Sequence, residues 1–265
     1  MIDNYPVVDV HVHIGRETKG IYGILGQSPE TLIDRMDRNG IDHTVCFSMV
    51  NTAGLEHAGI QECNDYVIEA VNKYPDRLIG LCLTSPRHGQ KALDEVRRCV
   101  DAGLRGIKLH PHLLGYYPID GELMDPFMEL AQELDIPVLT HSDINSKRCT
   151  PYQVVLLADR HPNVPVIMSH WGMDPDFVHF VPQLVKDHSN VYLDSSCTPN
   201  LPEFIFARPA KVMPNRLLFG SDGPTLSVEV ELKKLEVAEE LYGLTKEEKG
   251  KILGENAMKL FKIKR

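Results

Sequence analysis

Two histidines and an aspartate alternate along one short apolar stretch near the start of the sequence. Asp9, His11 and His13 lie between β-branched residues in the run from Pro6 to Ile14, a pattern typical of a buried parallel strand. Because successive side chains of a strand point to opposite faces, we expect these three side chains to share one face. Two imidazoles on one face at the end of a strand can bind one metal ion, although both can equally be ordinary strand residues.

More ionisable residues stand at the ends of other apolar runs. Lys108 and His110 end the run 104–110, His141 ends 136–141, His170 ends 164–170 and Asp222 ends 216–222. Five of the 12 histidines therefore fall at predicted strand ends. Three imidazoles and one carboxylate suit a divalent ion such as Zn²⁺, which keeps a position open for water in catalytic sites. These ligand types do not identify the metal, so Mn, Fe, Ni and Co remain alternatives to Zn.

The elements that carry these residues alternate along the whole chain. Further strands are predicted at 43–50, 78–83 and 190–195, and helices at 28–39, 57–73, 90–101, 123–134, 151–160, 175–187, 202–212, 228–242 and 246–261. Eight strands, each followed by a helix, imply parallel pairing with right-handed crossovers. In about 250 residues this pattern predicts an α/β fold of the (β/α)8 TIM-barrel type, as one domain over residues 1–265. An open doubly wound sheet is the alternative, but no Gly-rich dinucleotide loop follows the first strand.

Composition limits the classes of partner. The formal net charge of −9 argues against nucleic acid, since phosphate binding needs a basic patch. No apolar stretch approaches the roughly 20 residues of a membrane span, and the first residues lack a signal-peptide core. The six cysteines form no Cys-x-x-Cys motif, which favours reduced thiols. We therefore expect a cytoplasmic protein with a small-molecule substrate, and a homodimer only as the commonest assembly.

The order of the motifs resembles a known family. The Asp9-x-His11-x-His13 opening looks like the amidohydrolase superfamily. Further motifs resemble the amidohydrolase-2, decarboxylase-like branch of this superfamily. They are His141 and the segments 106–111, 169–172, 190–194, 219–222 and 255–261. The match covers nearly the whole chain in the right order.

The resemblance implies a barrel with one catalytic divalent metal ion. His11, His13 and His141 would be ligands, and Asp222 would be a further ligand or would hydrogen-bond to the metal-bound water. His170 would be a nearby acid, base or polarising group. Asp9, deeper on the same face, would orient a ligand histidine or form a satisfied carboxylate of the barrel floor.

Substrate contacts are expected from residues around this centre. Lys108 corresponds to a strand that carries a carboxylated, metal-bridging lysine in two-metal relatives, but a structural or substrate-facing lysine is favoured at this depth. His110 and Trp171 are candidates for contact with the substrate. The alternative for His110 is a hydrogen-bonded histidine at the rim of the barrel, and the alternative for Trp171 is packing within a loop. Arg16, Arg87 and Arg148 follow strands, and any of them could bind a carboxylate in a bidentate manner. Arg16 is our candidate among the substrate-binding residues.

Two reactions fit these residues. In the first, a metal-dependent hydrolase activates water, Asp222 accepts its proton, and the metal with His170 stabilises the oxyanion formed from an amide, ester or lactone. In the alternative, a metal-dependent decarboxylase protonates carbon before CO₂ leaves, with Arg16 or Arg148 as anion clamp. A non-catalytic metal-binding barrel is disfavoured, because a structural site needs no open position.

Overall fold

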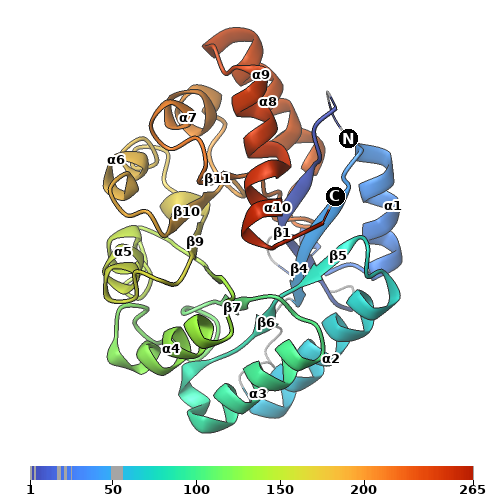
Figure 1. The fold of residues 1–265 in the computed structure, drawn as a ribbon, viewed down its shortest axis with the longest axis vertical. Helices are drawn as coiled ribbons and strands as arrows, with labels where there is room; N and C mark the ends of the chain where they lie inside the picture. Colours follow the sequence, from blue (N-terminus) through green and yellow to red (C-terminus); the bar gives the residue numbers. More distant parts are fainter. Residues whose placement is uncertain are drawn as a thin grey trace.

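The chain forms a ring of parallel strands enclosed by helices (Figure 1). The computed structural model describes residues 2, 4–16, 19–20, 23–24, 26–48 and 56–264. Neighbouring strands of the ring pair in parallel, and a helical segment lies between most consecutive strands of the chain. The predicted α/β barrel is therefore confirmed.

The strands are shorter than predicted but lie within the predicted segments. In chain order they are β1 (Val8–Ile14), β4 (His43–Ser48), β5 (Leu78–Gly80), β6 (Cys82–Leu83), β7 (Ile107–Leu109), β8 (Val138–Thr140), β9 (Val166–Ser169), β10 (Val191–Asp194) and β11 (Leu217–Leu218). They pair in the orders β1-β4-β5 and β6-β7-β8-β9-β10-β11. The predicted strand 78–83 is divided at Leu81, whose N–H donates to Cys46 O at 2.9 Å. Two short antiparallel strands, β2 (Lys19–Gly20) and β3 (Gly23–Ile24), lie between β1 and α1.

Backbone hydrogen bonds join the first strand to the segment that follows the last. The Asp222 N–H donates to His11 O at 2.9 Å, and the His13 N–H donates to Gly223 O at 2.7 Å. These bonds connect the two ends of the ring of strands. They also bring Asp222 next to the two histidines of β1, although more than 200 residues separate them in the sequence.

The helices lie around the outside of the ring (Figure 1). They are α1 (Pro29–Asn39), α2 (His57–Lys73), α3 (Gln90–Asp101), α4 (Asp125–Glu133), α5 (Pro151–Arg160), α6 (Val181–Val185), α7 (Arg208–Val212), α8 (Val228–Tyr242), α9 (Lys246–Gly250) and α10 (Asn256–Leu260). Short 3₁₀ turns occupy Pro86–His88, Glu122–Met124 and His170–Gly172, and π-type turns occupy Glu203–Ala207 and Lys251–Glu255. Both ends of α1 are capped: Ser28 Oγ accepts the Thr31 N–H at 3.2 Å, and Gly40 ends the helix at φ 66°.

The helix predicted over 175–187 is much shorter in the structure. Only Val181–Val185 is α-helical, and a separate turn precedes it. Asp174 organises that turn, because its carbonyl accepts the Phe177 and Val178 N–H groups and its side chain accepts the Asp176 N–H at 2.9 Å. Pro182 lacks an N–H, so it is suited to the first turn of a helix and not to the continuation of one.

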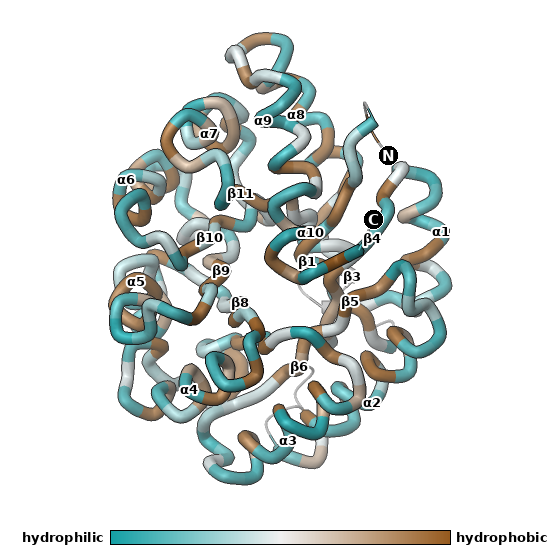
Figure 2. The backbone as a smooth tube through the Cα atoms, in the orientation of Figure 1, coloured by the Kyte–Doolittle hydropathy of each residue, from teal (hydrophilic) through white to brown (hydrophobic). Residues whose placement is uncertain are grey.

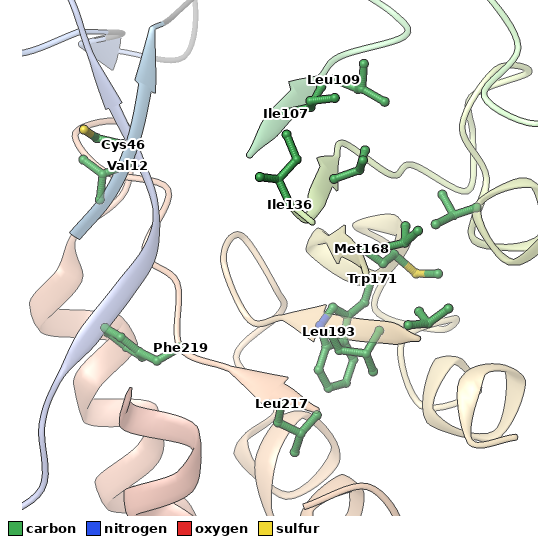
Figure 3. Close-up of a cluster of buried hydrophobic side chains, with 14 of the residues drawn as sticks. Val12, Cys46, Ile107, Leu109, Ile136, Met168, Trp171, Leu193, Leu217 and Phe219 are labelled. Carbon is green, nitrogen blue, oxygen red and sulfur yellow. The ribbon is translucent and has the colours of Figure 1, made fainter. Parts of the chain in front are cut away.

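Two hydrophobic clusters stabilise the barrel. One lies between strands and helices, and Figure 3 shows some of its side chains, from Val12 on β1 to Leu217 on β11. The other combines strand residues from around the ring with residues of the C-terminal segment, and so fills the interior below the strand ends: Val8, Val10, Val45, Phe47, Ile79, Leu81, Leu139, Ile167, Leu218, Ala257, Met258 and Phe261. In Figure 2 hydrophobic residues concentrate on the strands, and the outer turns of the helices are mostly hydrophilic.

The cysteines agree with the sequence analysis. All six are free thiols; Cys46, Cys82, Cys99 and Cys149 are buried, and Cys63 and Cys197 are half-buried. Among the described helices, none has the length and apolar character required to cross a membrane.

Candidate metal centre

A β-bulge in β1 decides which side chains enter the barrel. Asp9 pairs with Thr44 and Val12 pairs with Cys46, so three steps along β1 match two steps along β4. The extra residue on β1 is the mark of a bulge. Beyond it His13 pairs with Phe47, and their rings meet with centroids 4.8 Å apart.

The bulge reverses the alternation predicted for β1. Residues that pair directly across a sheet point to the same side. His13 therefore points inward with Phe47, which belongs to the interior cluster, whereas Asp9 points outward with Thr44. The prediction that Asp9 shares the face of the histidines is wrong, because it assumed a strand without an extra residue.

Asp9 has a structural environment instead. Its carboxylate accepts the Ser221 Oγ–H at 2.6 Å, the Ser221 N–H at 2.9 Å and the His11 N–H at 3.2 Å. Burial raises the pKa of Asp9 to about 7, against the lowering effect of these hydrogen bonds. Asp9 contacts the backbone of His11 and joins β1 to the segment after β11, as expected for a satisfied carboxylate.

His11, His13 and Asp222 come together at the carboxyl ends of β1 and β11. His13 Nε2 lies 3.1 Å from Asp222 Oδ1, and His11 Nε2 lies 3.4 Å from the same oxygen. One potential ligand atom from each residue lies within 4.8 Å of the others. Both imidazoles are buried, and the Asp222 side chain is 16% exposed. Three of the four predicted metal ligands are therefore neighbours in the structure.

The protonation states suit metal binding. Burial lowers the pKa of both His11 and His13, and for His11 the neighbouring Lys108 lowers it further. Burial would raise the pKa of Asp222, but the hydrogen bond with His13 and nearby positive groups outweigh it, so the net pKa lies below the ordinary value. Neutral imidazoles and an ionised carboxylate are the forms in which these side chains bind metal ions.

Asp194 and Ser196 orient His11, a role that the sequence analysis did not assign. Asp194 Oδ2 lies 2.6 Å from His11 Nδ1, and the Ser196 hydroxyl donates to the same carboxylate oxygen at 3.0 Å. A proton on Nδ1 faces Asp194 and leaves Nε2 free toward Asp222. A carboxylate behind a histidine is the usual arrangement in metal sites. Asp194 stands at a predicted strand end, but its partner is 183 residues away in the sequence.

His141 and His110 form a second pair of imidazoles beside this group. Their rings stack with centroids 4.2 Å apart and planes 11° apart, and His141 meets the ring of His170 at 5.0 Å. Burial lowers the pKa of both His110 and His141 well below the ordinary value. His141 is not part of the tight group formed by His11, His13 and Asp222. Its role as a ligand, and that of His110 in substrate contact, stay predictions.

His170 follows β9 and faces the same centre. Its Nδ1 lies 3.0 Å from Ser196 O and 3.1 Å from Ser196 Oγ. Its ring centroid is 4.8 Å from that of His11. His170 also forms a group with Asp222 and with Cys197, a residue that the sequence analysis did not consider. The catalytic role of His170 stays a prediction.

Lys108 points into the barrel from β7. Its Nζ lies 3.4 Å from His11 Nε2 and 4.3 Å from the centroid of the Phe47 ring. Burial lowers the pKa of Lys108 to about 8, although Asp222 and Asp194 act in the opposite direction. At neutral pH this side chain therefore places a positive charge beside the two histidines.

The predicted substrate residues outside the ring differ in their surroundings. Arg16 is exposed, and Trp171 is 1% exposed within the hydrophobic cluster shown in Figure 3. Arg87 holds the loop after β7, since its guanidinium donates to Gly115 O at 2.8 Å and Tyr116 O at 2.9 Å. Substrate binding by Arg16 and Trp171 stays a prediction, and the packing of Trp171 is the alternative foreseen for it.

Arg148 has a different environment from the other arginines. Its guanidinium carbon lies 4.5 Å from the centroid of the Tyr116 ring. Its Nε is buried and has no hydrogen-bond partner among the described residues. Binding of a substrate carboxylate by Arg148 stays a prediction.

Comparison with known proteins places this site in a family. The sequence profile of the amidohydrolase family matches residues 8–263. The chain belongs to the amidohydrolase family. It is therefore an enzyme of a metal-dependent type, and the predicted resemblance is confirmed. No curated protein matches the sequence.

Solved amidohydrolase-type structures share the fold. A 2,6-dihydroxybenzoate decarboxylase from Rhizobium is 17% identical with a TM-score of 0.80, covering 98% of this chain and 99% of its own. A dihydroxybenzoic acid decarboxylase from a Polaromonas species, with manganese and 2-nitroresorcinol bound, is 17% identical with a TM-score of 0.76 and 98% coverage of both chains. A probable 2-pyrone-4,6-dicarboxylic acid hydrolase from Acinetobacter baumannii, with citric acid bound, is 18% identical with a TM-score of 0.70, covering 97% and 99%.

Proposed function

We propose that this amidohydrolase is a metal-dependent hydrolase that cleaves an amide, ester or lactone bond of a small molecule. The observation that carries the proposal is the ionised Asp222 carboxylate beside Nε2 of both His11 and His13. This arrangement combines a set of metal ligands with a base at one point.

The residues present fit a divalent cation. His11 and His13 present buried, neutral imidazoles, Asp222 presents an anionic oxygen, and Asp194 fixes the orientation of one ring. Such mixed nitrogen and oxygen donors suit Zn²⁺ and its neighbours, and manganese is present in one structural relative. When bound, the ion would supply a Lewis acid that lowers the pKa of water from 15.7 to about 7.

Different residues of the protein carry out the proton transfers and stabilise the developing charge. Asp222 accepts a proton from the attacking water and returns it to the leaving group. His170, held by Ser196, donates to the oxygen on which negative charge develops. The buried cation of Lys108 strengthens the binding of negative charge at the same place.

A second candidate reaction, non-oxidative decarboxylation, is favoured by Arg148. The unpartnered Nε of Arg148 and the cation of Lys108 provide positive charge for an organic acid. Decarboxylases of dihydroxybenzoic acids are among the structural relatives. A carboxylate-bearing substrate is consistent with either reaction.

The substitution Asp222→Asn tests the hydrolase mechanism. We expect turnover to fall by about 10²–10⁴-fold, because the amide cannot accept the proton, while the metal remains bound. The assay compares wild type and variant on a panel of amides, esters and lactones with and without a carboxylate, and elemental analysis measures their metal content. Asp143→Asn, in the loop after β8, is the control and should stay active.

Two outcomes would count against the hydrolase. Full activity of Asp222→Asn with bound metal would remove Asp222 from the mechanism. Release of CO₂ from 2,6-dihydroxybenzoate or related acids, without hydrolysis of any member of the panel, would assign the decarboxylase instead.

A further inference from the structure

Three residues at the ends of consecutive strands share a strained backbone. His170, Cys197 and Asp222 follow β9, β10 and β11, and their φ angles are 65°, 54° and 60°. Residues other than glycine rarely adopt this left-handed conformation, and it persists only where the surrounding structure imposes it. These three residues with a left-handed backbone follow neighbouring strands of the barrel.

The side chains of these residues form a group of ligand type. A ring nitrogen of His170, the sulfur of Cys197 and a carboxylate oxygen of Asp222 all lie within 4.8 Å of one another. His170 is 3% exposed, and Cys197 and Asp222 are partly buried. A nitrogen, a sulfur and an oxygen at these separations can bind one ion at their centre.

The hydrogen bonds of His170 point to the same use. Its Nδ1 lies 3.0 Å from Ser196 O, so Nδ1–H can donate to this carbonyl and leave the lone pair of Nε2 free. Histidines that bind metal ions typically donate their other ring N–H to a carbonyl or a carboxylate. His11 shows the same arrangement with Asp194 at 2.6 Å. In both imidazoles, a hydrogen bond at Nδ1 therefore leaves Nε2 available to bind a metal ion.

The segment that carries Cys197 is fixed by a buried ion pair. Lys234 of α8 donates to Thr198 O at 2.7 Å and to Glu231 Oε1 at 2.7 Å, and both side chains are at most 5% exposed. The Thr198 hydroxyl also donates to Ser195 O at 2.6 Å. These contacts hold the backbone on both sides of Cys197.

We propose that His170, Cys197 and Asp222 form a second metal site, distinct from the centre at His11 and His13, and that this site takes a thiophilic divalent ion such as Zn²⁺, Cd²⁺ or Co²⁺. The two groups of residues share the carboxylate of Asp222. The sulfur ligand selects against Mg²⁺ and Mn²⁺, which prefer oxygen. Because a thiolate is the form of cysteine that binds metal ions, binding of the ion releases the thiol proton of Cys197 to solvent.

Occupation of this site inhibits the enzyme, an inference that rests on the proposed function. An ion bound to Nε2 of His170 prevents this nitrogen from taking up the proton that it would donate to the substrate. The ion also partly neutralises the charge of Asp222. Excess Zn²⁺ should therefore reduce turnover, whereas excess Mn²⁺ should not.

Titration of the metal-free protein with Cd²⁺ and Co²⁺ tests the site without an activity assay. We expect wild type to bind two equivalents and to show a sulfur-to-metal charge-transfer absorption. Cys197→Ser should bind one equivalent and lose this absorption. Cys63→Ser, which removes another half-buried thiol, should behave as wild type. His13→Ala should lose an equivalent but keep the absorption, which separates the two sites.

A measurement on unmodified protein supports the titration in case a variant folds poorly. Saturating Cd²⁺, compared with Mn²⁺, should protect one thiol of the native wild type from a thiol-specific reagent, and mass analysis should identify it as Cys197. The proposal is overturned if wild type binds a single equivalent, if Cys197→Ser retains the absorption, or if Cys197 is not protected. Loss of activity in Asp222→Asn without these signatures would leave the proposed function intact and remove the second site.

Discussion

Among the described residues, a hydrogen bond between Nδ1 of a histidine and an aspartate occurs in a buried and in an exposed environment. His11 Nδ1 lies 2.6 Å from Asp194 Oδ2 with both side chains fully buried, and His188 Nδ1 lies 2.6 Å from Asp159 Oδ1 with side chains 24% and 50% exposed. In the buried pair the low local dielectric strengthens the interaction, and water cannot replace it. The exposed pair contributes little, as surface ion pairs commonly do. It therefore provides an internal reference for the buried pair.

The substitution Asp194→Asn should weaken metal binding. An amide can donate to His11 Nδ1 as well as accept from it, so it no longer fixes the proton there and Nε2 is less available. We expect the affinity for the first metal ion to fall by about 10–100-fold, measured by competition with a chelator. Asp159→Asn is the matched control and should leave the affinity unchanged. Equal affinities for Asp194→Asn and wild type would show that His11 needs no such partner.

At the level of single residues, the sequence predicted the metal-binding group of His11, His13 and Asp222 but not Asp194, which orients His11. His11, His13 and Asp222 stand at predicted strand ends, which lie on one side of a parallel barrel, and the resemblance to the amidohydrolase superfamily implied that they are ligands. Asp194 was not assigned, since a hydrogen bond across 183 residues depends on the register of two strands. Asp9 was placed on the wrong face for a similar reason: an extra residue in a strand leaves no mark in the pattern of apolar residues.

Close contact between strand ends determines the geometry of the centre. A Cβ atom added at Gly220 would lie 2.1 Å from Asp194 Oδ1 and 3.2 Å from His11 Cβ. The segment after β11 can therefore approach β10 and β1 only without a side chain at this position. A Cβ atom added at Gly254, on the C-terminal π-type turn, would lie 2.3 Å from the carbonyl oxygen of Pro6.

We expect Gly220→Ala to impair the metal centre specifically. The new methyl group must displace the Asp194 carboxylate, so metal affinity should fall toward that of Asp194→Asn, with a loss of stability of about 1–3 kcal/mol from overpacking. Chelator competition and urea unfolding measure the two effects. Gly254→Ala should lose stability without a change in metal affinity. An unchanged metal affinity in Gly220→Ala would mean that the strands separate and the carboxylate stays in place.

Elements with terminal signals were predicted best. The helices 57–73, 90–101, 151–160 and 228–242 have the predicted bounds, because a helix of this length shows its period and its ends in the sequence. The strands are shorter than the apolar runs that contain them, since a buried run continues beyond the last paired residue. The turn at Asp174 was absorbed into a predicted helix, because its polar residues are compatible with either structure.

The whole molecule depends on closure of the barrel interior at the end opposite the metal centre. Ala257, Met258 and Phe261 of the C-terminal segment pack with Val8 and other strand residues in the interior cluster. β1 therefore carries metal ligands at one end and contacts α10 near the other. The C-terminal segment supports the strand on which the centre is built.

Truncation of the largest of these residues should destabilise the protein as a whole. Phe261 is 2% exposed, so Phe261→Ala should cost about 3–5 kcal/mol and lower the urea midpoint. Lys259→Ala removes an exposed side chain of the adjoining helix α10 and should leave the midpoint within experimental error. If Phe261→Ala unfolds at the same urea concentration as wild type, the C-terminal segment is not part of the cooperative structure.

The left-handed residues at 170, 197 and 222 have a consequence for the evolution of the enzyme. Glycine adopts their backbone angles without a steric penalty, so at each position the residue that best relieves the backbone has no ligand atom. In a library of variants sorted only for heat resistance, with no demand for turnover, glycine should accumulate at these three positions. Such variants would retain the barrel fold but lose enzymatic activity, since stability and activity favour different residues at these positions.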